Sequence, residues 1–123
     1  GADIVFHASG NTGTGVFQAA QESGRFAIGV DRAQSITRPS YSDVILGSMI
    51  KRVDTPVYNS IEATVDGEFP GGEAVSLGLA EEGVDLVYGD SLGSEIPEAV
   101  ADEVSTARDG IVNGDISVPM SPQ

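Results

Sequence analysis

The segment VFHASGNTGTG, from Val5 to Gly15, decides how this chain folds. Its first residues, together with Ile4, have the β-branched and aromatic content of a buried strand. A glycine-rich turn follows, and apolar residues then recur at helical spacing from Val16 up to Gly24, a residue that suits the end of a helix. A strand, a turn and a helix in this order form the first half of a βαβ unit.

A second strand, from Phe26 to Val30, follows that helix at once and delivers Asp31 at its carboxyl end. In an open parallel sheet, ligands bind in the crevice outside the carboxyl ends of the strands. The glycine turn and Asp31 are therefore expected to face the same crevice, which is the first place to look for a function.

The composition indicates a globular chain. Its 123 residues, of which 40% are hydrophobic, suffice for a single core. No apolar run is long enough to span a bilayer, and the residues from Gly1 onward lack the charged-then-apolar pattern of a signal sequence. A start directly before a strand suggests a piece of a longer protein, with any targeting segment upstream. The absence of cysteine excludes disulfides, thiolate metal sites and cysteine nucleophiles from these residues.

The charge is strongly acidic: 19 Asp and Glu stand against 6 Lys and Arg, a net charge of −13. Such a field repels phosphate backbones, so nucleic-acid binding is disfavoured. An ordinary acidic surface is one interpretation. We favour adaptation to high salt, because acid enrichment coincides with the near elimination of lysine and salt screens repulsion between carboxylates. Lys51, the single lysine, is then expected to have a function.

The next part of the chain continues the α/β pattern. Residues 32–41 are rich in Ser, Thr and Pro and predict a loop. Residues 44–50 predict a third buried strand, and Lys51 lies where that strand stops. Apolar residues at every fourth position from Val53 to Val65 predict a helix that ends near Gly67.

The last part of the chain predicts a hairpin and a helix. Residues 75–79 and 84–88 alternate between apolar and other side chains around a turn at 81–83, which is typical of a hairpin at a sheet edge. A final helix is expected from Pro97 to a stop at Asn113-Gly114, and residues 116–119 form a short strand or an extended tail. No repeat or composition shift marks a second domain.

The glycine turn is an ambiguous ligand site. Gly10, Gly13 and Gly15 follow the order G-x-x-G-x-G, which is not the dinucleotide fingerprint, and the chain contains no P-loop. Backbone N–H groups at the start of a helix can bind any polar ligand oxygen. A tight βα turn without a ligand explains the same glycines, and both alternatives remain open.

Two charged residues are candidates for binding. Asp31 could chelate two vicinal hydroxyls of a ribose, or cap a loop beside Arg32. Lys51 could bind a ligand hydroxyl or carbonyl, or offset the charge of Asp31. A purely structural role is disfavoured, because a cation at the start of a helix interacts unfavourably with the helix macrodipole. His7 has no nucleophile partner, which favours a structural role. The acidic residues lack metal-ligand spacing, so no metal or cofactor is predicted.

Four segments together resemble the basic membrane protein family of ABC-transporter substrate-binding lipoproteins, which includes purine-nucleoside receptors. They are GADIVFHASGNTG (1–13), AIGVD (27–31), SMIKRVD (48–54) and NGDISVP (113–119). The resemblance runs from Gly1 to Pro119. Two places depart from the family pattern: Asn11 replaces the second glycine of the turn, and Arg32-Ala33-Gln34 replaces the more usual SDQ.

The resemblance implies an α/β fold, namely a three-layer Rossmann-like lobe of a type I periplasmic-binding-protein clamshell with a mostly parallel sheet. Residues 1–123 would form the carboxyl-terminal lobe, and the amino-terminal lobe of the receptor is absent. It also implies that a nucleoside, of the purine class, binds between the lobes. Its implied contacts are Asp31 on the ribose hydroxyls, Lys51 nearby and the backbone of Ser9, Gly10 and Gly13.

The resemblance further implies a non-enzymatic protein without a cofactor, whose partner is an ABC permease in the membrane. Its expected location is the extracellular face of the cell membrane, held by a lipid anchor upstream of Gly1. Two alternatives stay open. One is a ribose-type sugar-binding or regulator lobe of the same clamshell class. The other is the nucleotide-binding half of a Rossmann-type oxidoreductase, which the order of the glycines and the lack of an acid/base pair disfavour.

Overall fold

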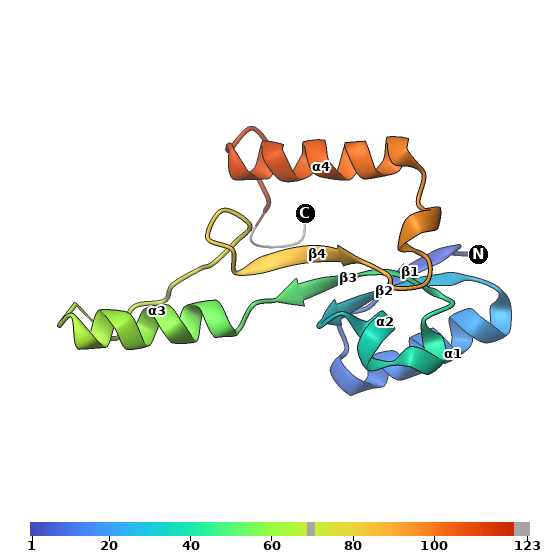
Figure 1. Ribbon diagram of the computed structural model, residues 1–123, viewed down its shortest axis with the longest axis horizontal. Coiled ribbons are helices and arrows are strands. Elements are labelled where there is room, and N and C mark those ends of the chain that lie inside the picture. Colours follow the sequence, from blue (N-terminus) through green and yellow to red (C-terminus); the bar gives the residue numbers. More distant parts are fainter. Residues whose placement is uncertain (69–70, 120–123) are drawn as a thin grey trace. The chain divides into compact units, whose positions relative to one another are not determined.

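A computed structural model describes residues 1–68 and 71–119, which divide into two compact units. Unit 1 comprises Gly1–Lys51 and Asp85–Ile96, and unit 2 comprises Arg52–Val84 and Pro97–Gln123. The elements in chain order are β1 (Ile4–Phe6), η1 (Gly10–Thr12), α1 (Gly13–Ser23), β2 (Phe26–Asp31), α2 (Gln34–Thr37), η2 (Pro39–Tyr41), β3 (Ile45–Lys51), α3 (Asp54–Val65), β4 (Val84–Tyr88), η3 (Gly93–Glu95) and α4 (Glu98–Val112). Figure 1 labels the strands and the α-helices with these names.

The sheet has the strand order β1-β2-β3-β4 (Figure 1). β1 pairs with β2 in parallel, and β2 pairs in parallel with β3, with one register shift between Ala27 and Ile28. β4 runs antiparallel to β3, and the Gly89 N–H donates to the Leu46 carbonyl at 2.7 Å. The predicted parallel strands at the start of the chain are thereby confirmed, as is the α/β class. The prediction that the first strand is buried is wrong, because all three residues of β1 are exposed.

The core of unit 1 lies between α1 and the sheet. Phe17 and Ile45 are fully buried, and the Phe17 ring lies 6.1 Å from the ring of Tyr41. The cluster consists of Phe17, Ala20, Ala27, Val44 and Ile45. α1 and α2 lie on the same face of the sheet (Figure 1). Unit 1 by itself thus has two layers, and the predicted third layer stays a prediction.

α1 begins at Gly13, three residues before the first apolar position of the predicted helix. It ends before Gly24, which adopts the left-handed conformation at φ +61°. The Arg25 N–H then donates to the Ala20 carbonyl at 2.9 Å, the closure that a left-handed residue after a helix permits. The predicted stop at Gly24 is confirmed.

Unit 2 contains α3 and α4, and neither helix has a buried residue. The apolar side chains that predict α3 are more than half exposed: Val57 53%, Ile61 60% and Val65 81%. Residues 78–83 form a closed loop, because the Gly83 N–H donates to the Gly78 carbonyl at 2.9 Å. No helix in the described part of the chain has the length and apolarity that crossing a membrane requires.

The predicted hairpin is wrong. Residues 75–79 form no strand, and Val75 is 66% exposed. The Gly78 N–H donates instead to the Glu81 carboxylate at 2.8 Å, so the turn at 81–83 closes on itself. β4 finds its partner in β3, whose edge offers hydrogen bonds over several residues. The alternation of apolar and polar residues predicts a strand, but it does not predict the strand with which it pairs.

The predicted loop at 32–41 is also wrong, because α2 and η2 occupy most of it. Pro39 opens η2, a position where its missing N–H leaves no hydrogen bond unmade. The proline therefore separates two short helices rather than preventing them. Of the two alternatives for residues 116–119, the tail is correct, since no strand forms there.

Candidate functional site

The glycine turn is helical. η1 runs directly into α1, and the Thr12 N–H donates to the Ser9 carbonyl at 3.1 Å. The Gly13 N–H donates to the Gly10 carbonyl, so the Gly13 amide is engaged inside the turn. Gly10 has φ +54°, with open space where a Cβ would lie. The turn therefore presents its Gly10 end, more than Gly13, to a ligand.

His7 explains the glycine at position 13. Its imidazole is 5% exposed, meets the Phe17 ring edge-on at 5.1 Å, and lies against Gly13 so closely that a Cβ there would overlap the ring. Its Nδ1 lies 3.2 Å from the Ser9 hydroxyl, while its buried Nε2 has no hydrogen-bond partner among the described residues. His7 thus packs the turn onto α1, a structural role of the kind that the sequence favours.

Asp31 has an unusual backbone. Its φ is +69°, although it is not glycine, and the Arg32 N–H donates to the Val30 carbonyl at 2.8 Å across it. A positive φ with a hydrogen bond between the residues on either side is the geometry of a γ-turn, which is rare and strained. Such strain persists only where neighbouring contacts hold it, and it is common at functional sites.

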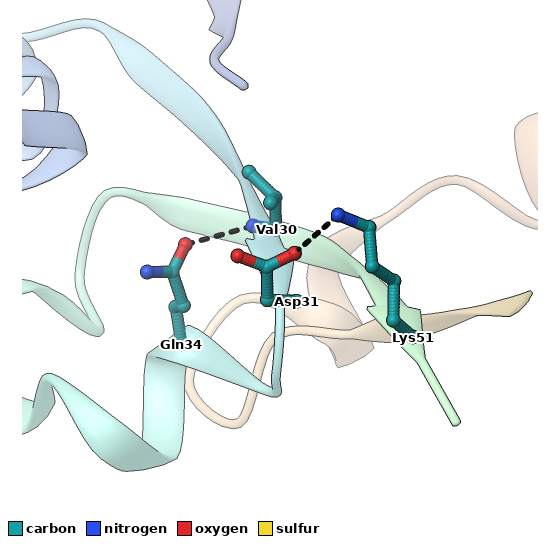
Figure 2. A network of polar contacts seen from close by, with 4 residues as sticks. All are labelled: Val30, Asp31, Gln34 and Lys51. Atoms are coloured by element: carbon teal, nitrogen blue, oxygen red, sulfur yellow. Dashed lines mark hydrogen bonds and ion pairs between the residues drawn. The ribbon is translucent and has the colours of Figure 1, made fainter. Parts of the chain in front are cut away.

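Those contacts come from α2 (Figure 2). The Val30 N–H donates to the Gln34 side-chain oxygen at 2.7 Å. The Gln34 N–H donates in turn to the buried hydroxyl of Ser48 on β3, at 3.0 Å. The Asp90 N–H donates to the buried Ser35 hydroxyl, also at 3.0 Å. α2 is thereby tied to β2, to β3 and to the residues after β4, and it positions the end of β2 that bears Asp31.

Gly29 makes room for this network. A Cβ on Gly29 would lie 2.7 Å from both the Gln34 side-chain oxygen and the Ser48 hydroxyl. Contacts that short do not occur for real side chains, so one partner would have to move. The glycine of the AIGVD segment is therefore required by the packing of α2, and not by its own backbone conformation.

Lys51 and Asp31 meet at the carboxyl ends of neighbouring strands. The Lys51 Nζ lies 2.9 Å from an Asp31 carboxylate oxygen, with the two side chains 56% and 48% exposed (Figure 2). Of the alternatives that the sequence leaves open for Lys51, the ion pair with Asp31 is present in the structure. An ion pair this exposed contributes little to stability. Both groups remain within reach of a ligand.

A cleft of about 430 Å³ opens beside this pair. Its lining comprises Gly10, Asn11, Val30, Asp31, Arg32, Gln34, Thr37 and Arg38. Of the predicted site residues, Gly10 and Asp31 line it, Lys51 reaches it through its ion pair, and Ser9 and Gly13 do not line it. Sequence reasoning missed Gln34, Thr37 and Arg38, because their helices were expected to be a loop. The sequence did contain one indication of these residues: Arg32 and Arg38 are two arginines close together in a strongly acidic chain.

Other hollows offer less chemistry. One in unit 1, of about 510 Å³, is lined mainly by small and apolar residues of β1, α1 and the start of β2. One in unit 2, of about 260 Å³, lies beside α3. Within residues 1–68 and 71–119, no three His, Asp or Glu side chains gather as a metal site. The cleft at Asp31 combines a concave surface with convergent polar groups, which is typical of a small-molecule site.

The chain is similar to known substrate-binding proteins and to related antigens. The family model for PnrA-like ABC transporter substrate-binding proteins matches residues 1–121. The CD4+ T-cell-stimulating antigen of Listeria innocua is 37% identical over 99% of this chain. The ABC transporter nucleoside-binding protein BmpA of Lactococcus lactis is 38% identical over 97% of it. The chain spans 37% and 36% of the lengths of these two relatives.

A solved structure agrees with the fold. The crystal structure of an ABC transporter system solute-binding protein from Aeropyrum pernix K1 superimposes with a TM-score of 0.76 and 25% identity. The match covers 100% of this chain and 42% of that one.

Proposed function

Because the chain belongs to the family of PnrA-like ABC transporter substrate-binding proteins, we propose that it forms part of a receptor that binds a nucleoside of the purine class. The support from relatives is the nucleoside-binding name of the Lactococcus lactis protein. The support from this chain is the cleft beside Asp31. Binding proceeds without any change in the ligand, so the protein acts as a receptor and not as an enzyme.

The observation behind this proposal is the way Asp31 is held. Its backbone is strained, its carboxylate is half exposed, and a buried hydrogen-bond network fixes the strand end on which it lies. A fixed carboxylate can accept hydrogen bonds from the two vicinal hydroxyls of a ribose. Lys51, 2.9 Å away, donates to a ligand oxygen from the other side. Sugar recognition needs donors and acceptors that are fixed in this way before the ligand arrives.

The remaining contacts come from the glycine turn. Of the predicted backbone contacts at Ser9, Gly10 and Gly13, we propose that Gly10 faces the ligand, because it lines the cleft and the other two do not. The residues that contact the base lie outside this chain, which spans a little over a third of the length of its relatives. We propose that the chain is the carboxyl-terminal lobe of a two-lobed clamshell. Closure of the lobes then presents the receptor to an ABC permease at the extracellular face of a membrane, where an upstream lipid anchor holds it.

The proposal is tested by calorimetry on the full-length protein in high salt, with adenosine, guanosine, inosine, ribose and NAD as ligands. The wild-type protein is expected to bind at least one purine nucleoside. Asp31→Asn removes the charge and one acceptor, which weakens binding about 10- to 100-fold, the equivalent of losing a charged hydrogen bond. Asp43→Asn is the matched control, because that carboxylate bonds Gln21 outside the cleft. It should leave the affinity unchanged.

Other outcomes have definite meanings. Nucleoside binding that survives Asp31→Asn overturns the site and leaves the receptor function in place. A protein that binds ribose and no nucleoside is a sugar receptor. Binding of NAD with turnover would show an oxidoreductase.

A further inference from the structure

The cleft beside Asp31 contains more positive charge than the acidic chain leads one to expect. The chain has six basic residues and a net charge of −13. Two of the six, Arg32 and Arg38, line the cleft, and Lys51 stands at its edge in contact with Asp31. Half of the cations of the chain therefore gather around one concave surface.

Within residues 1–68 and 71–119, the arginines of the cleft have no carboxylate partner. The carboxylate of Asp31 already pairs with Lys51 at 2.9 Å. Arg38 makes one long hydrogen bond, 3.4 Å from its Nη2 to the Asn11 side-chain oxygen. No hydrogen bond or ion pair joins the Arg32 guanidinium to another residue of the described ranges. Arg25, outside the cleft, behaves differently and pairs with Asp3 at 2.6 Å.

The backbones that bear these two guanidinium groups are fixed. The Arg32 N–H closes the γ-turn by donating to the Val30 carbonyl, which fixes the backbone of Arg32 directly after Asp31. The Arg38 N–H donates to the Gln34 carbonyl at 2.8 Å, and the Arg38 carbonyl accepts from Tyr41 at 2.9 Å. The two side chains therefore extend from held positions on opposite ends of α2. Arginine at a held position is well suited to bind a planar or tetrahedral oxyanion through two parallel hydrogen bonds.

We infer that the ligand bound at Asp31 bears a phosphate group, which Arg32 and Arg38 hold, so that the ligand class is a nucleoside monophosphate. This inference rests on the proposed function, since it assigns the ribose to Asp31. A bound phosphate explains why Arg32 and Arg38, which have no carboxylate partner among the described residues, line the same cleft. The cleft volume of about 430 Å³ lies within the range of small-molecule pockets. The paired Asp31 does not repel the phosphate strongly, because Lys51 offsets its charge.

The test compares adenosine, guanosine, their 5′-monophosphates and inorganic phosphate by calorimetry on the full-length protein at constant ionic strength. A monophosphate is expected to bind at least tenfold more tightly than its nucleoside. In the double variant Arg32→Ser with Arg38→Gln, the ratio of monophosphate affinity to nucleoside affinity should fall to about one. Arg25→Gln is the charge-matched control, and it should retain the advantage because Arg25 lies outside the cleft.

A variant that keeps the positive charge serves as a control in case the double variant does not fold. Arg32→Lys retains a cation without the planar fork, so it should lose part of the monophosphate advantage. Rising sodium chloride should weaken monophosphate binding more than nucleoside binding, because salt screens charge.

Contrary results are distinguishable. Equal affinity for nucleoside and monophosphate overturns the phosphate inference and leaves the nucleoside receptor standing. An advantage that survives in the double variant overturns the assignment to the two arginines. Binding of inorganic phosphate without any nucleoside or nucleotide overturns the ligand class and the proposed function together.

Discussion

Units 1 and 2 use the same kind of helix to different effect. α1 of unit 1 buries Phe17 and Ala20 against the sheet. α3 of unit 2 also has an apolar residue at every fourth position, and none of its residues is buried. Apolar periodicity therefore predicts that a helix forms, because one face prefers to avoid water. It does not predict what covers that face.

The two units also differ in charge. Unit 2 holds twelve of the 19 acidic residues and two of the six basic ones, whereas unit 1 holds seven and four. Their net charges are −10 and −3. The basic residues are thus concentrated in the unit that contains the cleft. The two units thus differ in net charge, and the unit that contains the cleft is the less acidic one.

The largest expected effect is a loss of core packing in unit 1. Phe17→Ala removes a fully buried ring that contacts His7 and Tyr41. We expect the free energy of unfolding to fall by about 3–5 kcal/mol, the usual cost of such a truncation. Denaturant unfolding followed by circular dichroism measures it.

Val57→Ala on α3 is the control for this prediction. Val57 is 53% exposed, so its truncation should change the free energy of unfolding by less than about 0.5 kcal/mol. Equal losses for the two variants would mean that α3 is covered as well as α1, and the contrast between the units would disappear.

The second prediction concerns the support of the cleft. Gly29→Ala places a methyl group 2.7 Å from the Gln34 and Ser48 oxygens and forces α2 away from the sheet. We expect a loss of about 1–3 kcal/mol, the cost of overpacking, with weaker ligand binding. Gly15→Ala is the matched control, since nothing lies within 4 Å of its Cβ position and alanine favours helix. A tolerated Gly29→Ala would show that α2 is not held by this network.

A smaller effect is expected at Asp31. Asp31→Gly relieves the strain of a positive φ, but it removes the exposed ion pair to Lys51 and adds freedom to the unfolded chain. These terms nearly offset one another, so stability should change by about 1 kcal/mol or less, while ligand binding is lost. Asp31→Ala keeps the strain and should be the less stable variant. The reverse order in thermal unfolding would contradict the strained γ-turn.

The smallest expected effect tests the proposal of adaptation to high salt. Raising potassium chloride should raise the melting temperature by a few degrees, because salt screens repulsion among the carboxylates concentrated in unit 2. Neutralising Asp102 and Glu103 of α4 as Asp102→Asn and Glu103→Gln should flatten this response. A melting temperature that falls with salt would remove the reason to propose a halophilic origin.

Local sequence patterns were enough to predict most of the elements and to select Asp31 and Lys51 as candidate site residues. Apolar spacing located β1, α1, β2, β3, α3 and α4, because the spacing of apolar side chains along the chain is a property of neighbouring residues. Gly24 ended α1 as expected, since glycine adopts a positive φ at little cost. Asp31 and Lys51 were recognised from their places at strand ends, and the ion pair between them followed from the parallel pairing of β2 and β3.

Features that depend on partners far away in the sequence became visible in the folded chain and not before. β4 pairs with the edge of β3 that β2 does not occupy. A local sequence pattern contains no information about which strand edge is available for pairing. α2 exists within a predicted loop because Ser48 and Val30 satisfy the hydrogen bonds of Gln34 from other parts of the chain. Helices of this length are not stable alone, so their formation depends on contacts that a short window of sequence cannot contain.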